Sequence, residues 1–188
     1  MKNYGLIFGQ DMNENHLKQV YDIDCRNYKM EYQGYFDNYI KRHTLNKNTF
    51  VCVTNEHGEI VAYINFFPIS DKLTEYILNS GDTIVDDDLA TTNYLDETLQ
   101  YTKCSKSDPR NNIFILSVVN DVHGPDKKQV SIILQVAFKH YLKSLEKDGY
   151  AISKIFGTTV TDAGRRFASR LGLKEYRKMN EEEIVYCT

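Results

Sequence analysis

A basic turn that follows an apolar run is the part of this sequence whose residue types best suit chemistry. Residues 113–119 are almost all apolar and predict a strand buried on both faces. Lys127 and Lys128 lie in the turn that follows, where a helical pattern begins. Unpaired amide N–H groups and the positive end of a helix dipole would meet there. The sequence therefore predicts an anion site, and a phosphate-bearing ligand is the first to test.

The elements around this turn are predicted by their periodicity. Apolar residues recur at helical spacing from Val130 to Leu145, and Gly149 ends this long helix. A strand is expected at 152–157. Thr161 then caps a short helix, which Gly172 ends.

The inner face of that short helix is expected to hold Ala163, Phe167 and Leu171. After it, residues 173–176 and 184–187 are separated by polar residues and predict a closing hairpin.

The first part of the chain predicts two amphipathic helices and a hairpin. Each helix has apolar or aromatic residues at helical spacing, namely Leu17, Val20, Tyr21, Cys25 and Tyr28 in the first and Tyr32, Tyr35, Phe36, Tyr39 and Ile40 in the second. Two β-branched and aromatic runs then flank a short loop at 55–58. The whole order predicts an α/β or α+β domain with a mixed sheet covered by helices.

Residues 69–111 follow a different pattern. They carry an acidic run at 86–88 and one helical piece around Leu73, Tyr76 and Ile77. A connection of this length is unusual inside a compact domain. We interpret it as an insertion between the third and fourth strands of a single domain that covers 1–188.

Bulk properties exclude several classes of protein. The 188 residues suit one domain, and 23 Lys and Arg against 26 Asp and Glu give a formal charge of −3. We therefore expect no nucleic acid partner. No apolar run reaches the length of a membrane span, and the first residues do not resemble a secretory signal. Four scattered cysteines without CxxC spacing favour reduced thiols in the cytoplasm.

Two motifs give the chain a resemblance to a known superfamily. SRLGLKEY, with Leu171, Gly172 and Leu173, matches a loosely kept LGF that ends a late helix. A turn motif R/Q-x-x-G-x-G/A would fall on Asp126, Gln129 and Ser131, of which Ser131 fits. In order and motifs the sequence resembles the GNAT superfamily of acyl-CoA-dependent N-acyltransferases, from about Leu17 to Tyr186.

The resemblance implies a mostly antiparallel central sheet flanked by helices, and acetyl-CoA or another acyl-CoA as co-substrate. By its pattern, the pyrophosphate would lie at the turn, with Lys127, Lys128, Gln129, Val130 and Ser131 as cofactor-binding residues. The two lysines are otherwise an ordinary solvated helix start.

The resemblance also assigns roles on the central strands. A backbone N–H at Val118 or Val119 would polarise the thioester carbonyl, and Thr158 would flank the pantetheine arm. Thr158 can instead belong to a turn that leads into the next helix.

Catalytic residues are harder to assign. Ala168 stands where the resemblance expects an acidic Tyr, so no Tyr is assigned. Asp121, in the turn after the strand, is the candidate general base. Ser117 is a candidate for holding a water, although a lone Ser in a strand is more often hydrogen-bonded to its neighbours. The histidines and cysteines lack metal-ligand spacing, so no metal site is expected.

The sequence thus predicts an N-acyltransferase, in the first instance an acetyltransferase, that acts on a small-molecule or peptide amine. The alternative is a non-catalytic acyl-CoA-binding or protein-interaction module on the same fold. Tyr32, Tyr35, Phe36 and Tyr39 are candidates for an acceptor wall, with core packing as the alternative. The acidic residues at 86–88 are candidates for attracting a cationic amine. A homodimer is among the assemblies to test.

Overall fold

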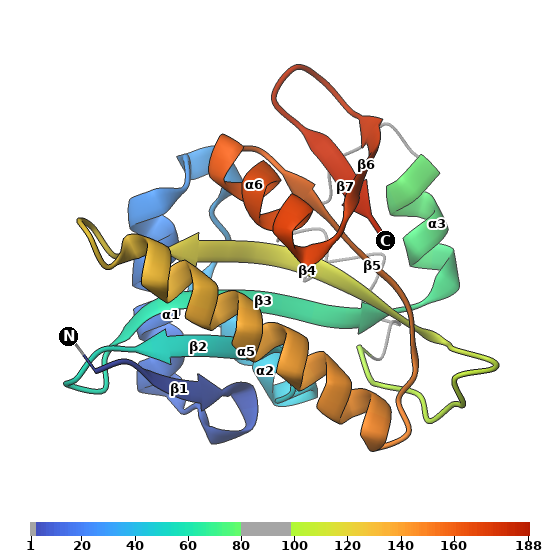
Figure 1. The fold of residues 1–188 in the computed structure, drawn as a ribbon, viewed down its shortest axis with the longest axis horizontal. Helices are drawn as coiled ribbons and strands as arrows, with labels where there is room; N and C mark the ends of the chain where they lie inside the picture. The colour runs from blue at the N-terminus through green and yellow to red at the C-terminus, as the bar shows by residue number, and fades with distance from the viewer. Residues whose placement is uncertain (1–2, 80–98) are drawn as a thin grey trace.

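The chain forms one mixed sheet between two layers of helices (Figure 1). The computed structural model describes residues 3–79 and 99–188. The sheet has seven strands in the order β1-β2-β3-β4-β5-β7-β6. These strands are β1 (Gly5–Phe8), β2 (Phe50–Thr54), β3 (Ile60–Ile69), β4 (Asn111–Asn120), β5 (Ile152–Thr159), β6 (Lys174–Lys178) and β7 (Ile184–Cys187). Every neighbouring pair is antiparallel except β4 and β5, which are parallel.

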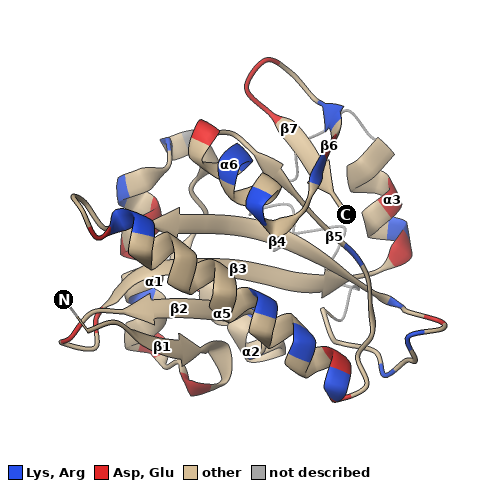
Figure 2. Cartoon of the chain, viewed as in Figure 1, with Lys and Arg blue, Asp and Glu red and all other residues tan. Residues whose placement is uncertain are grey.

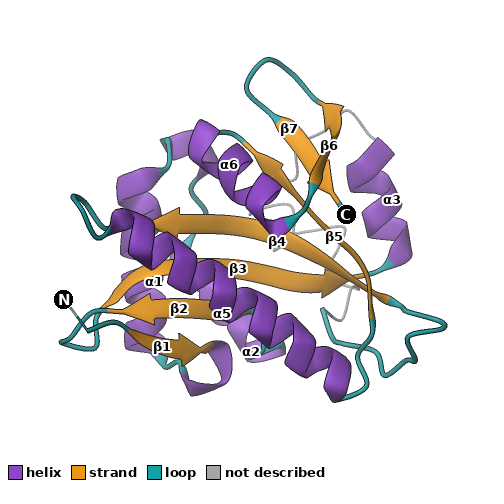
Figure 3. Ribbon diagram, viewed as in Figure 1, coloured by secondary structure: helices purple, strands orange, loops and turns teal. Residues whose placement is uncertain are grey.

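The helices cover both faces of the sheet (Figure 3). They are α1 (Glu14–Asn27), α2 (Phe36–Leu45), α3 (Asp71–Asn79), α5 (Lys127–Lys147) and α6 (Asp162–Leu171), with single 3-10 turns η1 (Gly9–Asp11) and η2 (Met30–Tyr32). In Figure 1, α5 and α6 lie in front of the sheet, whereas α1 and α2 lie behind it. The predicted fold class is confirmed: α/β, with a mostly antiparallel sheet between helices.

The two faces of the sheet form separate cores because side chains alternate along each strand. Ala62 and Ile64 of β3 pack in the front core with α5. Tyr63, between them, packs in the rear core with α1. The inward stripe of α5 contains Val130, Leu134, Phe138 and others at helical spacing, as the sequence predicts.

The local predictions for the helices and hairpins are confirmed, with three differences. The second predicted helix included Tyr32 and Tyr35, but the backbone is extended at Gln33, so Tyr32 lies in η2 and α2 begins only at Phe36, after the Tyr35 N-cap. β1 is an additional short edge strand that pairs with β2, and its four residues are too few for a clear alternation. Ala163 is exposed, so the predicted inner face of α6 was wrong at that position. The Thr161 cap begins the helix so that Phe167, Ala168 and Leu171 face the sheet instead.

β4 turns away from β5 in the middle of the sheet. Asn65 pairs with Ser117 and Phe66 with Ile115, so Leu116 is an extra residue in β4. Such a β-bulge bends the strand that carries it. The parallel pairing with β5 ends at the next position, where Ile115 is opposite Gly157. Beyond this pair the two strands diverge and leave a gap.

Gly157 allows the close approach that precedes the divergence. A Cβ at this position would lie 2.8 Å from the Ile115 carbonyl oxygen, a backbone atom that cannot move alone. We therefore expect Gly157→Ala to lower the free energy of unfolding by about 1–3 kcal/mol. Ser153→Ala, at an exposed position of the same strand, should change it by less than about 0.5 kcal/mol. Urea unfolding of the two variants checks this, and equal stabilities would show that the strands tolerate a wider spacing.

Candidate active site

A cavity of about 120 Å³ lies where β4 and β5 diverge. Its walls include Leu116, Ser117 and Val118 of β4, Gly157, Thr158 and Thr159 of β5, Phe167, Ala168 and Leu171 of α6, and Asp24, Tyr28, Tyr32 and Tyr39 from the α1–α2 region. Because α6 lies in front of the sheet and α1 behind it, the cavity crosses the plane of the sheet. It can therefore hold groups that approach from both faces.

The backbone of Val118 faces this cavity. Tyr28 Oη donates a hydrogen bond of 3.3 Å to the Val118 carbonyl oxygen. On an antiparallel strand, the N–H and the carbonyl of one residue point to the same side. The Val118 N–H therefore also points into the gap, where it can polarise a carbonyl. Val119 is turned the other way, with its side chain in the rear core.

Asp24 places a buried carboxylate on the α1 side of the cavity, with 4% of its surface exposed. Tyr39 donates to its Oδ2 and Tyr63 donates to its Oδ1. The Ser117 hydroxyl in turn donates to Tyr63 Oη at 3.3 Å. These bonds join α1, α2, β3 and β4 around one carboxylate, and both of its oxygens accept.

The sequence of α1 explains why Asp24 is buried. Leu17, Val20 and Asp24 lie at i, i+3 and i+7 on the buried face of this helix. A capping box between Asn13 and His16 fixes where the helix begins, and so which face is turned inward. Asp24 therefore occupies a position in the apolar stripe.

Burial and the neighbouring carboxylate keep the tyrosines of this cluster protonated. Burial, and after it the charge of Asp24, raises the pKa of Tyr28. The same two causes raise the pKa of Tyr63 well above its ordinary value. The hydroxyls of both therefore remain hydrogen-bond donors at neutral pH.

The first turn of α5 lies at the end of β4, as the anion-site prediction requires. The helical hydrogen bonds begin with Val130 N to Asp126 O, so the amides of Lys128 and Gln129 precede them. No acidic residue lies in this turn. The Asp126 carboxylate, just before the turn, accepts from Tyr4 at 3.2 Å. Figure 2 shows Lys and Arg at this end of α5 and on α6.

Asn120 connects this turn to β4. Its side-chain amide donates to the Lys127 carbonyl at 2.8 Å and to Ser131 Oγ at 2.7 Å. Lys127 and Lys128 are exposed, whereas the Val130 side chain is fully buried in the front core. Of the predicted cofactor-binding residues in the turn, Val130 can offer only its backbone.

Asp121 lies outside the cavity and is held by α1. It accepts from Arg26 Nη2 at 2.7 Å and from Asn27 Nδ2 at 2.7 Å. Partial burial raises its pKa, but the hydrogen bonds from Asn27 and Arg26 outweigh this and leave the pKa lowered. The structure therefore ties this carboxylate to the end of α1.

The structure brings together only part of the predicted site. Ser117, Val118 and Thr158 line the cavity, whereas Val119, Asp121, Lys127, Lys128, Gln129, Val130 and Ser131 do not. Of the predicted acceptor wall, Tyr32 and Tyr39 line it, Tyr35 is 67% exposed, and Phe36 packs against Tyr21. The acidic residues at 86–88 lie outside the described residues.

Asp24, Tyr28 and Tyr63 were missed as site residues by sequence reasoning. One signal was present: Asp24 is a carboxylate within an apolar stripe, where a charge is costly unless it has partners. Tyr28 was interpreted only as a member of that stripe. The sequence around Tyr63 gives no indication of its hydrogen bond to Asp24 of α1.

Neither a metal cluster nor a membrane span is found within 3–79 and 99–188. No group of three or more His, Cys, Asp or Glu side chains in these ranges is arranged to hold a metal ion. No helix in them is long and apolar enough to cross a membrane.

No protein-family model and no curated protein matches this chain. Several solved structures do. The loading GNATL domain of CurA from Lyngbya majuscula is 13% identical, with a TM-score of 0.61 over 98% of this chain and 96% of that chain. The GphF GNAT-like decarboxylase in complex with isobutyryl-CoA is 12% identical, with a TM-score of 0.61 over 98% and 97%.

A structure from Arabidopsis thaliana agrees with these. Arabidopsis thaliana NAA60 in complex with acetyl-CoA is 10% identical, with a TM-score of 0.61 over 98% of this chain and 97% of that chain. Since coverage is nearly complete and identity is low, the likeness concerns the fold. The chain has the GNAT fold, in a divergent sequence.

The Arg26–Asp121 pair gives a testable dependence of stability on pH. Because the folded pKa of Asp121 is lowered, the pair stabilises the fold above the unfolded pKa of about 3.9, and this is lost as pH falls through the folded value. Arg26 is 57% exposed, so solvent screens the pair. We expect Asp121→Asn to lower the free energy of unfolding by about 0.5–1 kcal/mol at pH 7.

Urea unfolding at pH 7 and at about pH 2.5 checks this, since the loss should vanish in acid. Asp108→Asn is the control, because Asp108 and Arg110 form a pair in which both side chains are more than 60% exposed. Asp108→Asn should lower the free energy of unfolding at pH 7 by less than Asp121→Asn does. A loss for Asp121→Asn that persists at the acidic pH would contradict the assigned cause.

Proposed function

We propose that this protein is an N-acyltransferase that moves an acyl group, in the first instance acetyl, from CoA to an amine. The observation that carries the proposal is the cavity between the diverging β4 and β5, with the Val118 N–H turned into it. The side of β4 that β5 leaves unpaired beyond Ile115 offers an acyl-CoA both a channel and a hydrogen-bond donor.

An acyl-CoA would reach from the first turn of α5 to the cavity between β4 and β5. Its pyrophosphate would lie on the first-turn amides of α5, with Lys127 and Lys128 as flanking charges. Its pantetheine arm would run between β4 and β5 past Thr158, and the thioester carbonyl would accept from Val118 N–H. Two of the structures with this fold contain isobutyryl-CoA and acetyl-CoA.

Tyr28 is our candidate for the proton donor to the leaving thiolate. Its hydroxyl lies 3.3 Å from the Val118 carbonyl oxygen, beside the N–H that would hold the thioester. Its hydroxyl is protonated at neutral pH, and because burial raises its pKa it would give up the proton only as negative charge develops on the adjacent sulfur. Ala168 faces the same cavity from α6 and leaves room there. We infer that the α1 side supplies the acid that α6 lacks.

The charge of the cavity favours an amine acceptor. Asp24 is the one charged side chain among the described residues that line it. A negative charge there would repel a second carboxylate, such as that of an acyl-CoA bound for decarboxylation. The same charge attracts a cation. This favours acyl transfer to an amine over the decarboxylase chemistry named for one of the similar structures.

Filling the cavity should weaken acyl-CoA binding. Ala168→Phe places a ring between α6 and β4, so we expect calorimetry with acetyl-CoA to show affinity reduced by at least about 10-fold. Ala163→Phe, on the exposed side of the same helix, should bind like the parent chain. Thermal unfolding confirms that both variants are folded. Equal affinities of the two variants for acetyl-CoA would show that the acyl-CoA does not bind in this cavity.

Removing the proposed acid should slow turnover without weakening binding. We expect Tyr28→Phe to lower kcat by about 100-fold, since general acid catalysis contributes on this order. Tyr35→Phe, nearby but 67% exposed, should leave kcat unchanged. The rate at which free CoA thiol is released in the presence of an amine gives kcat for both variants. Acyl-CoA binding without turnover in the parent chain would instead favour a binding module.

A further inference from the structure

We infer that the acceptor is a small primary amine with an apolar, aryl-sized body, and that Asp24 recognises its ammonium group. This inference rests on the proposed acyl transfer and specifies the substrate class. Charge, wall composition and the closure of the cavity each support it independently.

The charge of Asp24 sets the recognition. Both of its oxygens accept from tyrosine hydroxyls, which orient the carboxylate but leave its negative charge in place. A bound ammonium would be attracted by this negative charge in the cavity wall. An uncharged acceptor of the same shape would not.

The walls around Asp24 suit an apolar body beside the ammonium. Tyr28, Tyr32 and Tyr39 contribute aromatic rings on the α1–α2 side, and Phe167 contributes one on the α6 side. Aromatic faces attract an ammonium and also contact an apolar chain or ring. The combination of one carboxylate with several aromatic rings is matched to an arylalkylamine.

The outer side of the cavity is bridged by side chains, which limits the size of the acceptor. The loop between β6 and β7 is bound to η2: Tyr32 donates to Glu183 at 3.3 Å, and Lys29 is 3.4 Å from Glu182. Arg165 of α6 also donates to the Glu182 carbonyl at 2.9 Å.

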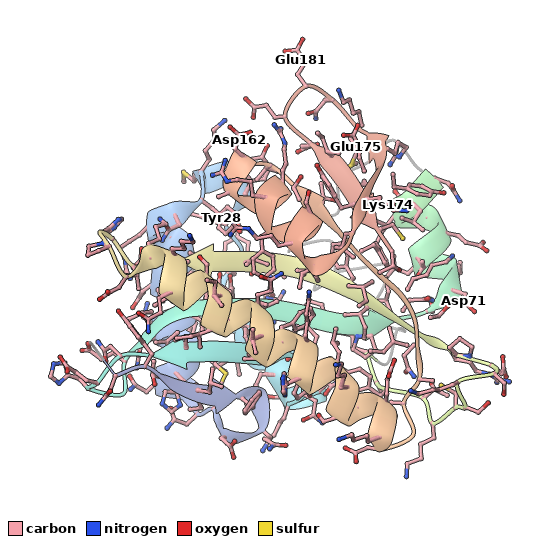
Figure 4. The ribbon with its side chains drawn as sticks, in the orientation of Figure 1. Tyr28, Asp71, Asp162, Lys174, Glu175 and Glu181 are labelled. Atoms are coloured by element: carbon pink, nitrogen blue, oxygen red, sulfur yellow. The ribbon has the colours of Figure 1, made fainter. Side chains whose placement is uncertain are left out.

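In Figure 4, Tyr28 lies beside β4 and below Asp162, which marks the start of α6, and Glu181 lies at the outer tip of the β6–β7 loop. A polypeptide could not cross the bridged gap without breaking these contacts. A small amine need not cross it, and the cavity volume of about 120 Å³ suits a compact group.

Asp24 then has a defined part in the transfer. It accepts one proton from the ammonium and leaves a neutral amine, whose lone pair attacks the thioester carbon. The new C–N bond forms and the C–S bond breaks, with its electron pair on sulfur. The second nitrogen proton leaves to water, and the sulfur receives a proton from Tyr28, which water then reprotonates. The products are an amide and free CoA thiol, with one net proton released from Asp24.

The first test compares probes on the unaltered chain with acetyl-CoA. We expect phenethylamine to be acetylated, whereas 2-phenylethanol, which has the same shape without the charge, should neither react nor compete. Tetra-alanine with a free amino terminus should be at least about 100-fold poorer in kcat/KM. Competition by the alcohol equal to that of the amine, or a better peptide substrate, would overturn the inference.

The second test uses Asp24→Asn, with Asp22→Asn as its matched control on the same helix. The Asp22 side chain is 46% exposed and pairs with Lys18 at 2.8 Å. We expect Asp24→Asn to lower kcat/KM for phenethylamine by at least about 100-fold and to leave the affinity for acetyl-CoA unchanged. Asp22→Asn should match the parent. Equal kcat/KM for the two folded variants would overturn the role of Asp24.

Calorimetry with acetyl-CoA and isobutyryl-CoA separates this inference from the function on which it rests. If neither binds, the proposed function fails and the inference fails with it. If acyl-CoA binds and the peptide is acetylated in preference to phenethylamine, acyl transfer stands and the acceptor class alone is wrong. Should Asp24→Asn fail to fold, the comparison of amine with alcohol on the parent chain still decides.

Discussion

Parallel pairing between β4 and β5 ends at Ile115 and Gly157, and the rest of the site follows from that ending. A sheet that stayed paired would satisfy its own backbone groups and leave no space between the strands. The extra residue at Leu116 bends β4, so that the Val118 backbone turns into a gap instead of toward β5. One β-bulge therefore creates both the cavity and the hydrogen-bond donor inside it.

The Asp24 cluster connects this gap to the rear helices. Its hydroxyl donors come from α2 and β3, and Ser117 of β4 extends the chain of hydrogen bonds. A buried carboxylate is tolerated when its partners are held in place, and here the rear core holds Tyr39 and Tyr63. The same packing that stabilises α1 on the sheet thus positions Asp24, the one charged side chain that the described residues contribute to the cavity wall.

Sequence reasoning predicted the parts of the fold that local periodicity encodes. The stripe from Val130 to Leu145 and the caps at Thr161 and Gly172 are local patterns, and α5 and α6 follow them. Ser117, Val118 and Thr158, which line the cavity, were predicted from the order of strands in the superfamily that the sequence resembles. No local pattern marks the partners of a charge. Tyr63 is 39 residues from Asp24, and Arg26 is 95 residues from Asp121.

This explains why sequence reasoning selected Asp121, and not Asp24, as the candidate base. Asp121 follows the buried strand directly, so proximity in sequence suggested a base, yet Arg26 and Asn27 hold it outside the cavity. Asp24 lies in a helical stripe where only its burial distinguishes it. Because the cavity crosses the sheet, a group on α1 reaches the same space as one on α6. The resemblance to the superfamily predicts a tyrosine where this chain has Ala168 on α6. The Tyr28 hydroxyl reaches Val118 from the opposite face of the sheet instead.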